Sequence, residues 1–337
     1  MAQGGTGLSA IPQIALVGCG NWGKNLCRNF HALGALSSVV DATENGQTTA
    51  LSIAPDPEII GNLDDVLRND QIQGVALATP AETHAELAIQ AMEAGKDVFV
   101  EKPMALTLED AEKMKKVAEE TGRILMVGHL LEFHPAVLKL REMIASGQLG
   151  KINYIYSNRL NFGKVRTEEN ALWSFAPHDV AVILRLMGQV PVEVSACGGS
   201  YLTNGIADTT MSNLKFNDRS RAHIFVSWLH PFKEQRLVVV GDKMMAIFND
   251  VAPFREKLQL FPQSVEFEGA LPLLKKKDAE FVEHANAEPL REECKHFLKS
   301  IQSRKQPLTN VQSGIHVLKV LHACQQSIEQ NGAPVSL

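Results

Sequence analysis

The stretch Ile14-Ala-Leu-Val-Gly18-Cys-Gly20-Asn-Trp-Gly23 decides the fold of this chain. An apolar run leads directly into the pattern Gly-x-Gly-x-x-Gly, and an amphipathic pattern typical of a helix follows it. In such an arrangement Gly18 allows a tight turn, Gly20 lets the backbone approach a pyrophosphate, and Gly23 lets the helix pack close to the strand. The pattern therefore predicts a dinucleotide site at a helix N-terminus. The residues expected to line it are Gly18, Gly20, Asn21, Trp22 and Gly23.

An acidic residue follows the next apolar run, at the distance that this fingerprint requires. The run Leu36-Ser-Ser-Val-Val ends at Asp41, about 20 residues after the glycine turn. Its carboxylate can accept hydrogen bonds from both ribose hydroxyls, and no Arg or Lys follows in Asp41-Ala-Thr-Glu-Asn to attract a 2′-phosphate. We therefore predict NAD rather than NADP as the cofactor. The alternative interpretation of Asp41 is a surface acid that follows a buried strand.

Composition excludes several classes of protein. With 337 residues, of which 45% are hydrophobic, the chain is long enough for two domains with their own cores. A net charge of −5 argues against nucleic acid or an anionic membrane as a partner, and no apolar stretch is long enough to span a bilayer. The five cysteines are odd in number and widely spaced, which predicts neither a disulfide framework nor a metal site. A cytoplasmic location is the simplest interpretation, with residues 1–7 as a loose tail rather than a signal peptide.

The first part of the chain alternates short apolar runs with amphipathic stretches, which is typical of a parallel sheet with helices on both faces. Strands are expected at 13–17, 36–40, 74–79, 97–100 and 124–127, and helices at 22–33, 83–94 and 108–120. Thr107, followed by Asp110, predicts the N-cap of the last of these helices. Ligands of parallel sheets bind where the strands end. The candidates at these positions are Thr79, Pro80, His84, Glu101, Lys102 and His129.

The second part is rich in β-strand patterns. After a helix expected at 134–145, strands are predicted at 151–160, 192–197, 208–216, 222–229, 236–240 and 244–248. Hairpin turns are expected at 217–220 and 241–243, helices at 176–186, 289–303 and 313–329, and a loop at 264–277. We therefore predict an α/β protein with a doubly wound Rossmann domain at 1–130. An α+β domain with a large open, mostly antiparallel sheet, covered on one face, is predicted at 131–337.

Lys102 is a candidate catalytic residue because it stands at the tip of a buried parallel strand. An ammonium there lies beside the expected nicotinamide, where it can donate to a substrate hydroxyl and stabilise alkoxide charge. The alternative is an ion pair with Glu101. The Lys102–Pro103 bond, in a tight turn, is also a candidate for a cis peptide bond.

His178 is the second candidate catalytic residue. Pro177 suits the first turn of a helix, which would place His178 at the N-terminal end. The helix dipole there lowers the pKa of a histidine, which favours the neutral imidazole that can accept a proton. A lone histidine is more often structural.

Together these motifs resemble the Gfo/Idh/MocA oxidoreductases, and the resemblance covers nearly the whole chain. It rests on Gly18-x-Gly20-x-x-Gly23, Ala78-Thr79-Pro80-x-x-x-His84, Glu101-Lys102-Pro103 and a helix-borne His178. It implies a nicotinamide cofactor, hydride exchange at a sugar or cyclitol carbinol, and homodimers or homotetramers that pair through the large sheet. It further implies that Lys102 and His178 form the catalytic pair and that Thr79, Pro80, His84 and Glu101 lie on the cofactor side. Many relatives have Asp where this chain has Ser174, so the division of roles between Lys102 and His178 is open.

Residues 158–179 are similar to members of this family that oxidise the 3-hydroxyl of UDP-N-acetylglucosamine or of its uronic acid. The cations in this segment can supply the charge-assisted hydrogen bonds that a diphosphate requires. Its amides can recognise sugar hydroxyls or the acetamido group, and its tryptophan can pack on a ring. The alternative is a solvated basic loop whose cations are neutralised by Glu168 and Glu169. The substrate-binding residues predicted are Lys102, His129, Arg159, Asn161, Lys164, Arg166, Asn170, Trp173, Ser174 and His178.

The sequence therefore predicts NAD-dependent oxidation of UDP-N-acetylglucosamine to its 3-keto derivative, in a crevice between the two domains. In this interpretation His178 is the general base, and the product feeds 3-amino sugar synthesis for lipopolysaccharide or lipid A. Alternatives are the uronic acid form of the substrate, an inositol or a free sugar, or a non-catalytic sensor that keeps NAD as a structural ligand. The expectation on which this depends is that the Lys102 ammonium lies within reach of the His178 imidazole.

Overall fold

A computed structural model describes residues 11–337, which form two compact units. Unit 1 contains the chain up to Gly128 together with Glu288–Ile315, and unit 2 contains His129–Ala287 and His316–Leu337. The expected tail at 1–7 lies outside the described residues. The first boundary falls close to the one expected, but residues 288–315 were expected in the second domain and return to unit 1. Phe297 shows why, because its ring packs edge-on against Phe99 and Phe30, with centroids 5.8 and 6.5 Å away.

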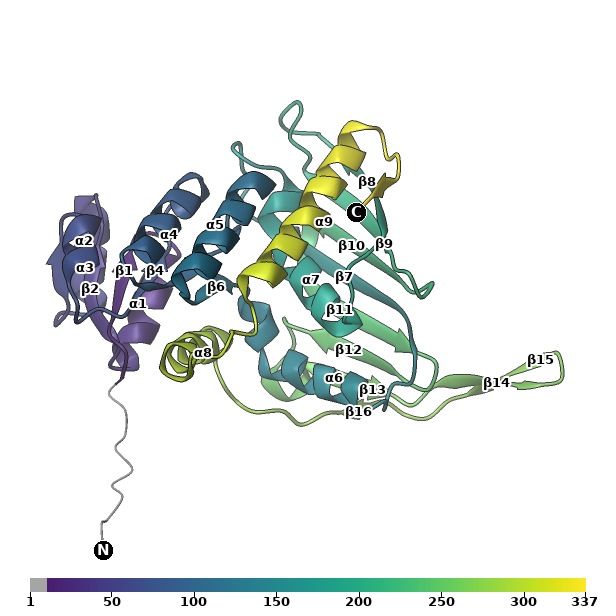
Figure 1. Ribbon diagram of the computed structural model, residues 1–337. Helices are drawn as coiled ribbons and strands as arrows, with labels where there is room; N and C mark the ends of the chain where they lie inside the picture. The colour runs from purple at the N-terminus through teal and green to yellow at the C-terminus, as the bar shows by residue number, and fades with distance from the viewer. Residues whose placement is uncertain (1–10) are drawn as a thin grey trace, which may run out of the picture. The chain divides into compact units, whose positions relative to one another are not determined.

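Unit 1 is built on a six-stranded parallel sheet in the order β3-β2-β1-β4-β5-β6 (Figure 1). Its strands are β1 (Ile14–Val17), β2 (Leu36–Val40), β3 (Glu58–Ile60), β4 (Gly74–Leu77), β5 (Asp97–Glu101) and β6 (Leu125–Gly128). Its helices are α1 (Gly23–Ala32), α2 (Glu44–Ile53), α3 (Leu63–Arg68), α4 (His84–Glu93), α5 (Leu108–Thr121) and α8 (Pro289–Ser303). The direction of strand addition reverses between β1 and β4, where sheets of this type bind ligands.

The expected Rossmann arrangement is confirmed, and each predicted strand and helix of residues 11–128 lies within two residues of its expected bounds. The predicted cap is confirmed as well, because the Thr107 hydroxyl accepts from the Asp110 N–H at 3.1 Å. Three elements, α2, β3 and α3, were not predicted. They are short and bury few apolar side chains, among them Ala50, Ile60 and Val66, so apolar periodicity gives them little signal.

Unit 2 is built on a nine-stranded sheet in the order β16-β13-β12-β11-β7-β10-β9-β8-β17. Only the β7–β10 pair among these is parallel. The strands are β7 (Ile152–Phe162), β8 (Glu193–Gly199), β9 (Thr209–Lys215), β10 (Arg221–Ser227), β11 (Leu229–Gly241), β12 (Met245–Asn249), β13 (Leu258–Phe261), β16 (Glu280–Phe281) and β17 (Val335–Ser336). The helices are α6 (Pro135–Ala145), α7 (Ala171–Met187) and the C-terminal part of α9 (Val311–Glu329).

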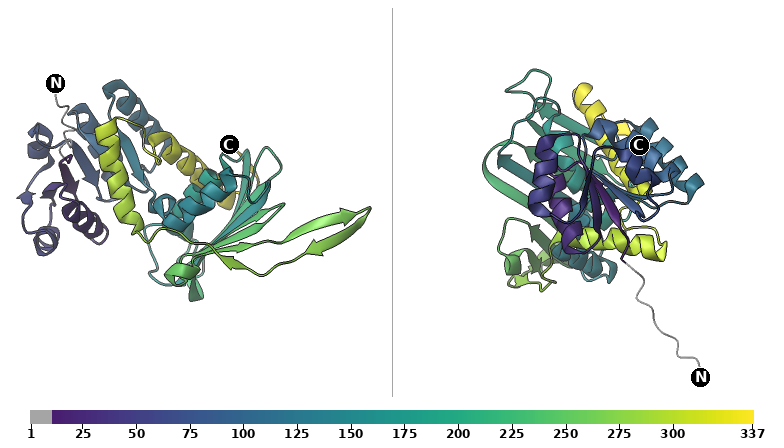
Figure 2. Two further views of the ribbon diagram at one scale, coloured as in Figure 1. Left: turned by 90° about the horizontal axis from the view of Figure 1, so that it is seen from below. Right: turned by 90° about the vertical axis from the view of Figure 1, so that its left-hand side faces the viewer.

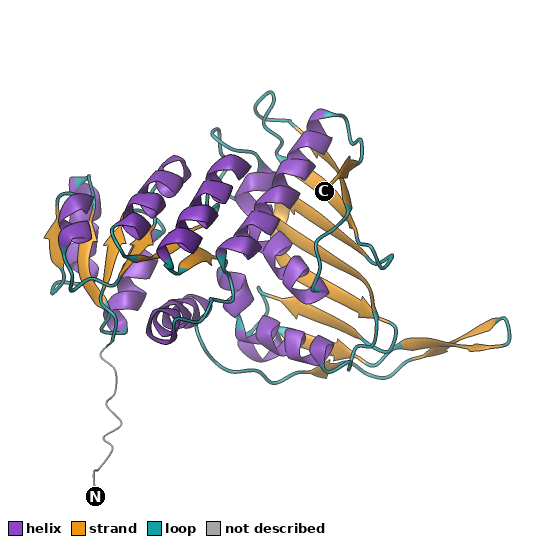
Figure 3. Cartoon of the chain, viewed as in Figure 1, coloured by secondary structure: helices purple, strands orange, loops and turns teal. Residues whose placement is uncertain are grey.

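Helices cover one face of this sheet, as Figure 3 shows. Leu140 of α6, Ile183 of α7 and Leu321 of α9 share one buried apolar core with strand residues of unit 2. On the opposite face Tyr154 and Met211 are 39% and 54% exposed. The predicted open, mostly antiparallel sheet with one covered face is therefore confirmed, and so are the hairpin turns at 217–220 and 241–243.

The start of α7 differs from the prediction, which took Pro177 as the first turn. The helix begins at Ala171, because the side chain of Asn170 accepts from the Trp173 N–H at 3.2 Å and caps it. Pro177 therefore lies inside the helix, with His178 after it.

The predicted loop at 264–277 was also wrong, because the segment forms a two-stranded ribbon. Strands β14 (Ser264–Glu268) and β15 (Leu271–Lys275) pair antiparallel and project away from the nine-stranded sheet (Figure 2). The apolar residues of the ribbon face solvent, with Phe267 70% and Leu274 67% exposed. The alternation is present in the sequence, but no core receives its apolar side chains. Among residues 11–337 no helix is long and apolar enough to cross a membrane.

Candidate active site

The glycine turn after β1 has the geometry of a phosphate cradle. Gly18 has φ +88°, and a Cβ there would lie 2.8 Å from the Ala78 carbonyl oxygen. A Cβ on Gly23 would lie 2.0 Å from the Gly18 carbonyl oxygen. A Cβ on Gly20 would meet nothing within 4 Å, and Gly20 is exposed. Fold geometry thus requires two of the three glycines, whereas Gly20 leaves open space at the start of α1, where no side chain caps the helix.

Asp41, directly after β2, presents its carboxylate to this turn. One oxygen accepts from the Cys19 N–H at 2.7 Å, and the other accepts from the N–H and the hydroxyl of Thr43 at 2.9 and 2.7 Å. Burial opposes the charge, but these hydrogen bonds hold the pKa of Asp41 below its ordinary value. A Cβ at Gly46 would lie 2.1 Å from this carboxyl group, so the first turn of α2 packs against it. The carboxylate is ionised and fixed beside the cradle, as ribose binding requires.

The ends of β4 and β5 are joined by a buried histidine. His84 places Nδ1 2.8 Å from the Pro103 carbonyl oxygen and Nε2 3.0 Å from that of Thr79. Burial lowers the pKa of His84, and the contacts of its ring with the two carbonyl oxygens oppose that shift. The Lys102–Pro103 bond is cis, which confirms that expectation. His84 was predicted on the cofactor side, and its position indicates a bridge between the Thr79-Pro80 turn and the turn that carries Lys102.

Glu101 connects the glycine turn to the end of β5. Its carboxyl group accepts from the Trp22 indole N–H and from the Lys102 backbone N–H, the latter at 3.3 Å. Burial raises the pKa of Glu101 to about 7, against the opposing effects of Trp22 and Lys102. A Cβ on Gly128, at the end of β6, would lie 2.9 Å from the same carboxyl group. Side chains and backbone from the ends of β1, β5 and β6 therefore converge on Glu101, and the half-buried Lys102 follows it.

In unit 2, α7 carries three of the predicted substrate-binding residues. Trp173 packs edge-on against His322 with ring centroids 5.0 Å apart, and Ser174 is buried. His178 is half-buried and is the eighth residue of the helix. The expectation that the helix dipole favours its neutral form was therefore wrong, because that effect falls off within the first turn. Its role as a base stays a prediction, as does its closeness to Lys102.

The predicted diphosphate-binding cations mostly have partners of their own. The Arg159 guanidinium forms a two-point ion pair with Asp179, at 2.7 and 3.2 Å, and its side chain is only 12% exposed. Arg166 pairs with Glu168 at 3.3 Å and Glu169 at 3.0 Å, which is the neutralisation weighed as the alternative. The expected cluster of three cations is therefore not assembled by the described residues of this segment, and any role of these side chains toward a diphosphate stays a prediction.

The other predicted residues of this set differ in their surroundings. Asn170 is engaged twice, since its oxygen caps α7 and its amide donates to Gln325 at 2.8 Å. Lys164 is exposed and forms no ion pair with any residue of 11–337. Asn161 is half-buried near the end of β7, and His129 is buried directly after β6.

Sequence reasoning missed several residues that shape these sites. Thr43 and Gly128 support Asp41 and Glu101, and Asp179 holds Arg159. Of these residues, only Asp179 could have been indicated by the sequence. Ser157 and Arg159 are two residues apart in a strand and so share one face, and an acid on the helix that covers this face can neutralise the arginine. Among the described residues, no group of three or more His, Cys, Asp and Glu side chains is arranged to hold a metal ion.

Residues 13–129 match the family model of the oxidoreductase family with NAD-binding Rossmann fold, and residues 137–247 match the Gfo/Idh/MocA C-terminal domain. The chain belongs to the Gfo/Idh/MocA oxidoreductases. NAD is therefore the cofactor of unit 1, and its open glycine turn and ionised Asp41 fit that molecule.

Relatives in this family carry different activities. The chain is 31% identical over 244 residues to 2,7-anhydro-N-acetylneuraminate hydratase of Mediterraneibacter gnavus, which covers 68% of this chain and 65% of the relative. It is 25% identical over 320 residues to UDP-N-acetylglucosamine 3-dehydrogenase of Acidithiobacillus ferrooxidans, covering 94% of this chain and 97% of that enzyme. A solved structure of that dehydrogenase superposes with a TM-score of 0.83 at 23% identity, over 94% of this chain and 97% of the other. The scyllo-inositol 2-dehydrogenase (NAD(+)) of Bacillus subtilis is 28% identical over 52% of this chain and 55% of that enzyme.

Proposed function

We propose that this protein oxidises the C3 hydroxyl of UDP-N-acetylglucosamine with NAD⁺ and forms the 3-keto sugar nucleotide. The observation that carries the proposal is the alignment with the Acidithiobacillus dehydrogenase, which spans almost the full length of both chains. The first curated relative, the hydratase, aligns over only 65% of its length, so it supports an activity less directly. The presence of Lys102 and His178, one in each unit, agrees with a catalytic role rather than a sensor that retains NAD as a structural ligand.

The residues of unit 1 are proposed to bind the cofactor as follows. The backbone at Gly20 and the start of α1 bind the pyrophosphate, and the Asp41 carboxylate accepts hydrogen bonds from the ribose hydroxyls. The ends of β4 and β5, with Thr79, Pro80 and Glu101, border the nicotinamide. When bound, NAD⁺ supplies the hydride acceptor, and the protein contributes position and electrostatics.

His178 and Lys102 are proposed to divide the proton chemistry. The His178 imidazole accepts the proton of the C3 hydroxyl as general base. The Lys102 ammonium donates a hydrogen bond to the same oxygen and stabilises its negative charge as it develops. Ser174 cannot supply the carboxylate that many relatives have at this position, so the protein must orient the imidazole by other contacts.

The wider setting is proposed on the same basis. The enzyme works in the cytoplasm as a homodimer or homotetramer that associates through the exposed face of the unit 2 sheet. Its keto product is the substrate for transamination to a 3-amino sugar, for lipopolysaccharide or lipid A synthesis. Lys164, Asn161 and Trp173 remain the side chains proposed to contact the nucleotide sugar.

The test is a screen for NADH formation by the purified protein with UDP-N-acetylglucosamine, its uronic acid, an inositol and glucose. We expect turnover with UDP-N-acetylglucosamine to exceed that with the other compounds. Lys102→Ala should retain NAD binding but lose about 10²–10⁴-fold in kcat, and His178→Asn should remove the acidic limb of the pH–rate profile, where protonation of the base lowers the rate. Lys113→Ala, which removes an exposed ion pair of α5, should match the unmodified protein. No NADH with either nucleotide sugar, or an active Lys102→Ala variant, would overturn the proposal.

A second candidate is hydration of an anhydro sugar, which the 31% identity to the Mediterraneibacter hydratase favours. Such a reaction adds water and leaves no net NADH. The same incubations are therefore analysed by mass spectrometry, with 2,7-anhydro-N-acetylneuraminate included. A product one water heavier than the substrate, without NADH, would support this candidate over dehydrogenation.

A further inference from the structure

We infer that Asp179 is a positioning residue that, through Arg159 and Ser157, fixes the rotation of α7 and with it the direction in which His178 presents its imidazole. The inference deepens the proposed function and rests on the role proposed there for His178. It supplies what the residue at position 174 does not, namely a carboxylate that acts on the histidine, in this case through the helix rather than by direct contact.

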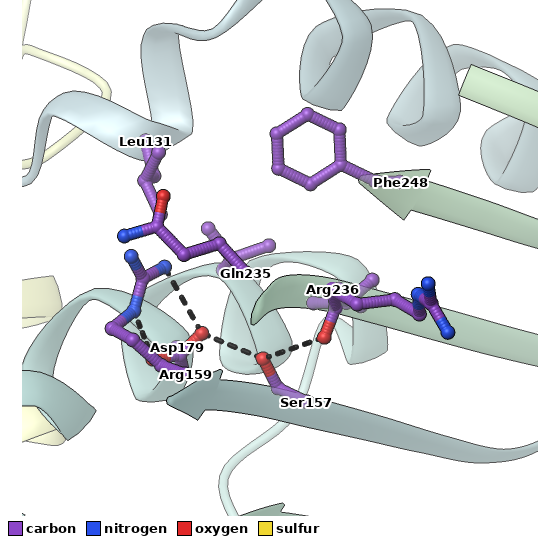
Figure 4. A pocket seen from close by; sticks show the side chains of 9 residues that line it. Leu131, Ser157, Arg159, Asp179, Gln235, Arg236 and Phe248 are labelled. Carbon is purple, nitrogen blue, oxygen red and sulfur yellow. Dashed lines mark hydrogen bonds and ion pairs between the residues drawn. The ribbon is translucent and has the colours of Figure 1, made fainter. Parts of the chain in front are cut away.

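Asp179 is buried and accepts three hydrogen bonds from side chains of β7. One carboxylate oxygen accepts from the Ser157 hydroxyl at 2.6 Å and from the Arg159 Nη2 at 3.2 Å. The other accepts from the Arg159 Nε at 2.7 Å. The Asp179 side chain is 4% exposed, and the three bonds converge from one strand onto one helical residue, as Figure 4 shows. Both carboxylate oxygens therefore bind groups of β7, and the side chain anchors α7 to that strand.

The strand that receives this anchor is β7, the central strand of the nine in unit 2. Ser157 and Arg159 lie two residues apart, so their side chains point to the same face of the sheet, the face that α7 covers. Ser157 also approaches the Arg236 carbonyl oxygen of neighbouring β11, at 3.4 Å. The helix is therefore tied to the central strand of the sheet by directional, charge-assisted bonds, and not by apolar contacts alone.

The space beside the Arg159 guanidinium is small. A cavity of about 10 Å³, room for about one water molecule, is bordered by Leu131, Gln235 and Phe248 (Figure 4). Packing therefore supports the guanidinium on this side, while the two-point ion pair with Asp179 sets its direction. Removal of the carboxylate takes away the bonds by which β7 fixes the rotation of α7.

Helix geometry converts this anchor into control of the neighbouring residue. Successive residues of an α-helix differ by about 100° in direction and about 1.5 Å along the axis, so His178 is rigidly coupled to Asp179. A side-chain tip lies about 6 Å from the axis, so a rotation of about 10° moves the imidazole by about 1 Å. Displacements of that size can reduce catalysis about 100-fold when geometry is critical.

The test uses the full-length protein and two kinds of variant. Asp179→Asn removes the charge and one acceptor oxygen. The double variant Arg159→Met with Asp179→Leu removes both charges and keeps apolar volume, a replacement that proteins often tolerate without loss of stability. The matched control is Asp208→Asn. Asp208 is equally buried in unit 2 and accepts from Tyr201, Leu202 and Trp228, but it lies outside α7.

We expect both Asp179 variants to lose about 10–100-fold in kcat per folded molecule, with KM changed less than about threefold. The primary isotope effect with C3-deuterated substrate should rise, because hydride transfer becomes slower relative to binding steps. Asp208→Asn should lower the unfolding temperature without changing kcat or the isotope effect per folded molecule. A folded double variant with unchanged kcat, or a control that loses as much kcat as Asp179→Asn, would overturn the inference.

A second readout does not depend on turnover. In nitrogen-15 spectra of the histidine rings, with the His178 signal assigned from His178→Asn, Asp179→Asn should shift or broaden that signal and Asp208→Asn should leave it unchanged. An unchanged His178 signal in Asp179→Asn refutes the positioning role. Full activity of His178→Asn instead refutes the proposed general base, and the ring spectra still decide whether Asp179 positions the imidazole.

Discussion

Alanine at Gly20 and at Gly23 should separate the two functions of the glycine turn. The two glycines are three residues apart, yet a Cβ on Gly23 would lie 2.0 Å from a backbone oxygen, and one on Gly20 would meet nothing within 4 Å. The shortest tolerated Cβ contacts lie near 3.0 Å and ordinary ones begin at 3.4 Å, so Gly23→Ala requires a displacement of 1.0 Å (3.0 − 2.0) to 1.4 Å (3.4 − 2.0) between α1 and the turn. Because the clashing atom belongs to the backbone, no side-chain rotation can relieve it.

The expected magnitudes differ accordingly. Gly23→Ala should destabilise unit 1 by about 1–3 kcal/mol, the usual range for overpacking, and lower the unfolding temperature by about 2–12 °C. Gly20→Ala should leave stability without NAD within about 0.5 kcal/mol of the unmodified protein. It places a methyl group where the pyrophosphate must approach, so we expect its Kd for NAD to rise at least about tenfold, or about 1.4 kcal/mol.

Thermal unfolding with and without NAD, together with calorimetric titration, measures both effects. At an NAD concentration of about 100 times the unmodified Kd, the ligand adds about 2.7 kcal/mol of stability. For Gly20→Ala the same concentration is about 10 times its Kd, which reduces the added stability to about 1.4 kcal/mol. If Gly20→Ala unfolds as early as Gly23→Ala without NAD, or binds NAD with unchanged Kd, our reasoning about the cradle is wrong.

Three further predictions follow from single features of the structure. Glu101 has a pKa of about 7 against an ordinary value of 4.5, so it contributes stability below about pH 4.5 that is lost as pH rises through 7, up to about 3 kcal/mol. The free energy of unfolding, measured in urea at pH 5 and pH 8, should therefore fall more between these two pH values for the unmodified protein than for Glu101→Gln. Equal decreases for the two proteins would contradict the raised pKa of Glu101. Asp41→Asn should raise the Kd for NAD by about 10–100-fold and bring it closer to the Kd for NADP. An unchanged ratio of the Kd for NADP to the Kd for NAD would show that Asp41 does not contact the ribose. Replacing residues 264–275 by an Asn-Gly turn should change the unfolding free energy by less than about 0.5 kcal/mol, because Phe267 and Leu274 face solvent, and a larger loss in urea unfolding would show that the ribbon supports the sheet.

Much of unit 1 could be predicted because its signals are local and agree with one another. The buried strands read as apolar runs, since both faces of a parallel sheet are covered, and Thr107 marks the start of a helix. The short helices α2 and α3 were not predicted, because their starts depend on caps from Thr43 and Asn62 rather than on apolar periodicity. The position of residues 288–315 in unit 1 was not predicted for another reason. The core against which a helix packs is decided by contacts with residues that are distant in sequence.

The candidate site was predictable in its residue types more than in its contacts. The sequence indicated Gly20, Asp41 and Lys102 through motifs whose spacing reflects backbone geometry. Arg159 was predicted to bind the diphosphate as one of three cations in one strand and the loop after it, and the sequence did not indicate its ion pair. Its partner, Asp179, comes from a helix 20 residues later, and only the packing of α7 on β7 brings the two together. Pro177 led to the wrong helix start because proline often occupies the first turn of a helix, whereas Asn170 caps this helix about two turns earlier.

The return of residues 288–315 to unit 1 has a consequence for the order of events during synthesis. The ribosome releases the six parallel strands long before α8, and until then Phe30 and Phe99 lack the Phe297 ring that packs on both. Asp97 likewise waits for Arg304, the residue that ends α8 and pairs with it. We expect a nascent chain that stops after Gly128 to expose apolar surface and to recruit chaperones. A recombinant fragment that ends at Gly128 should aggregate for the same reason. Grafting the nucleotide-binding half onto another protein will therefore require carrying this late helix along as a second piece.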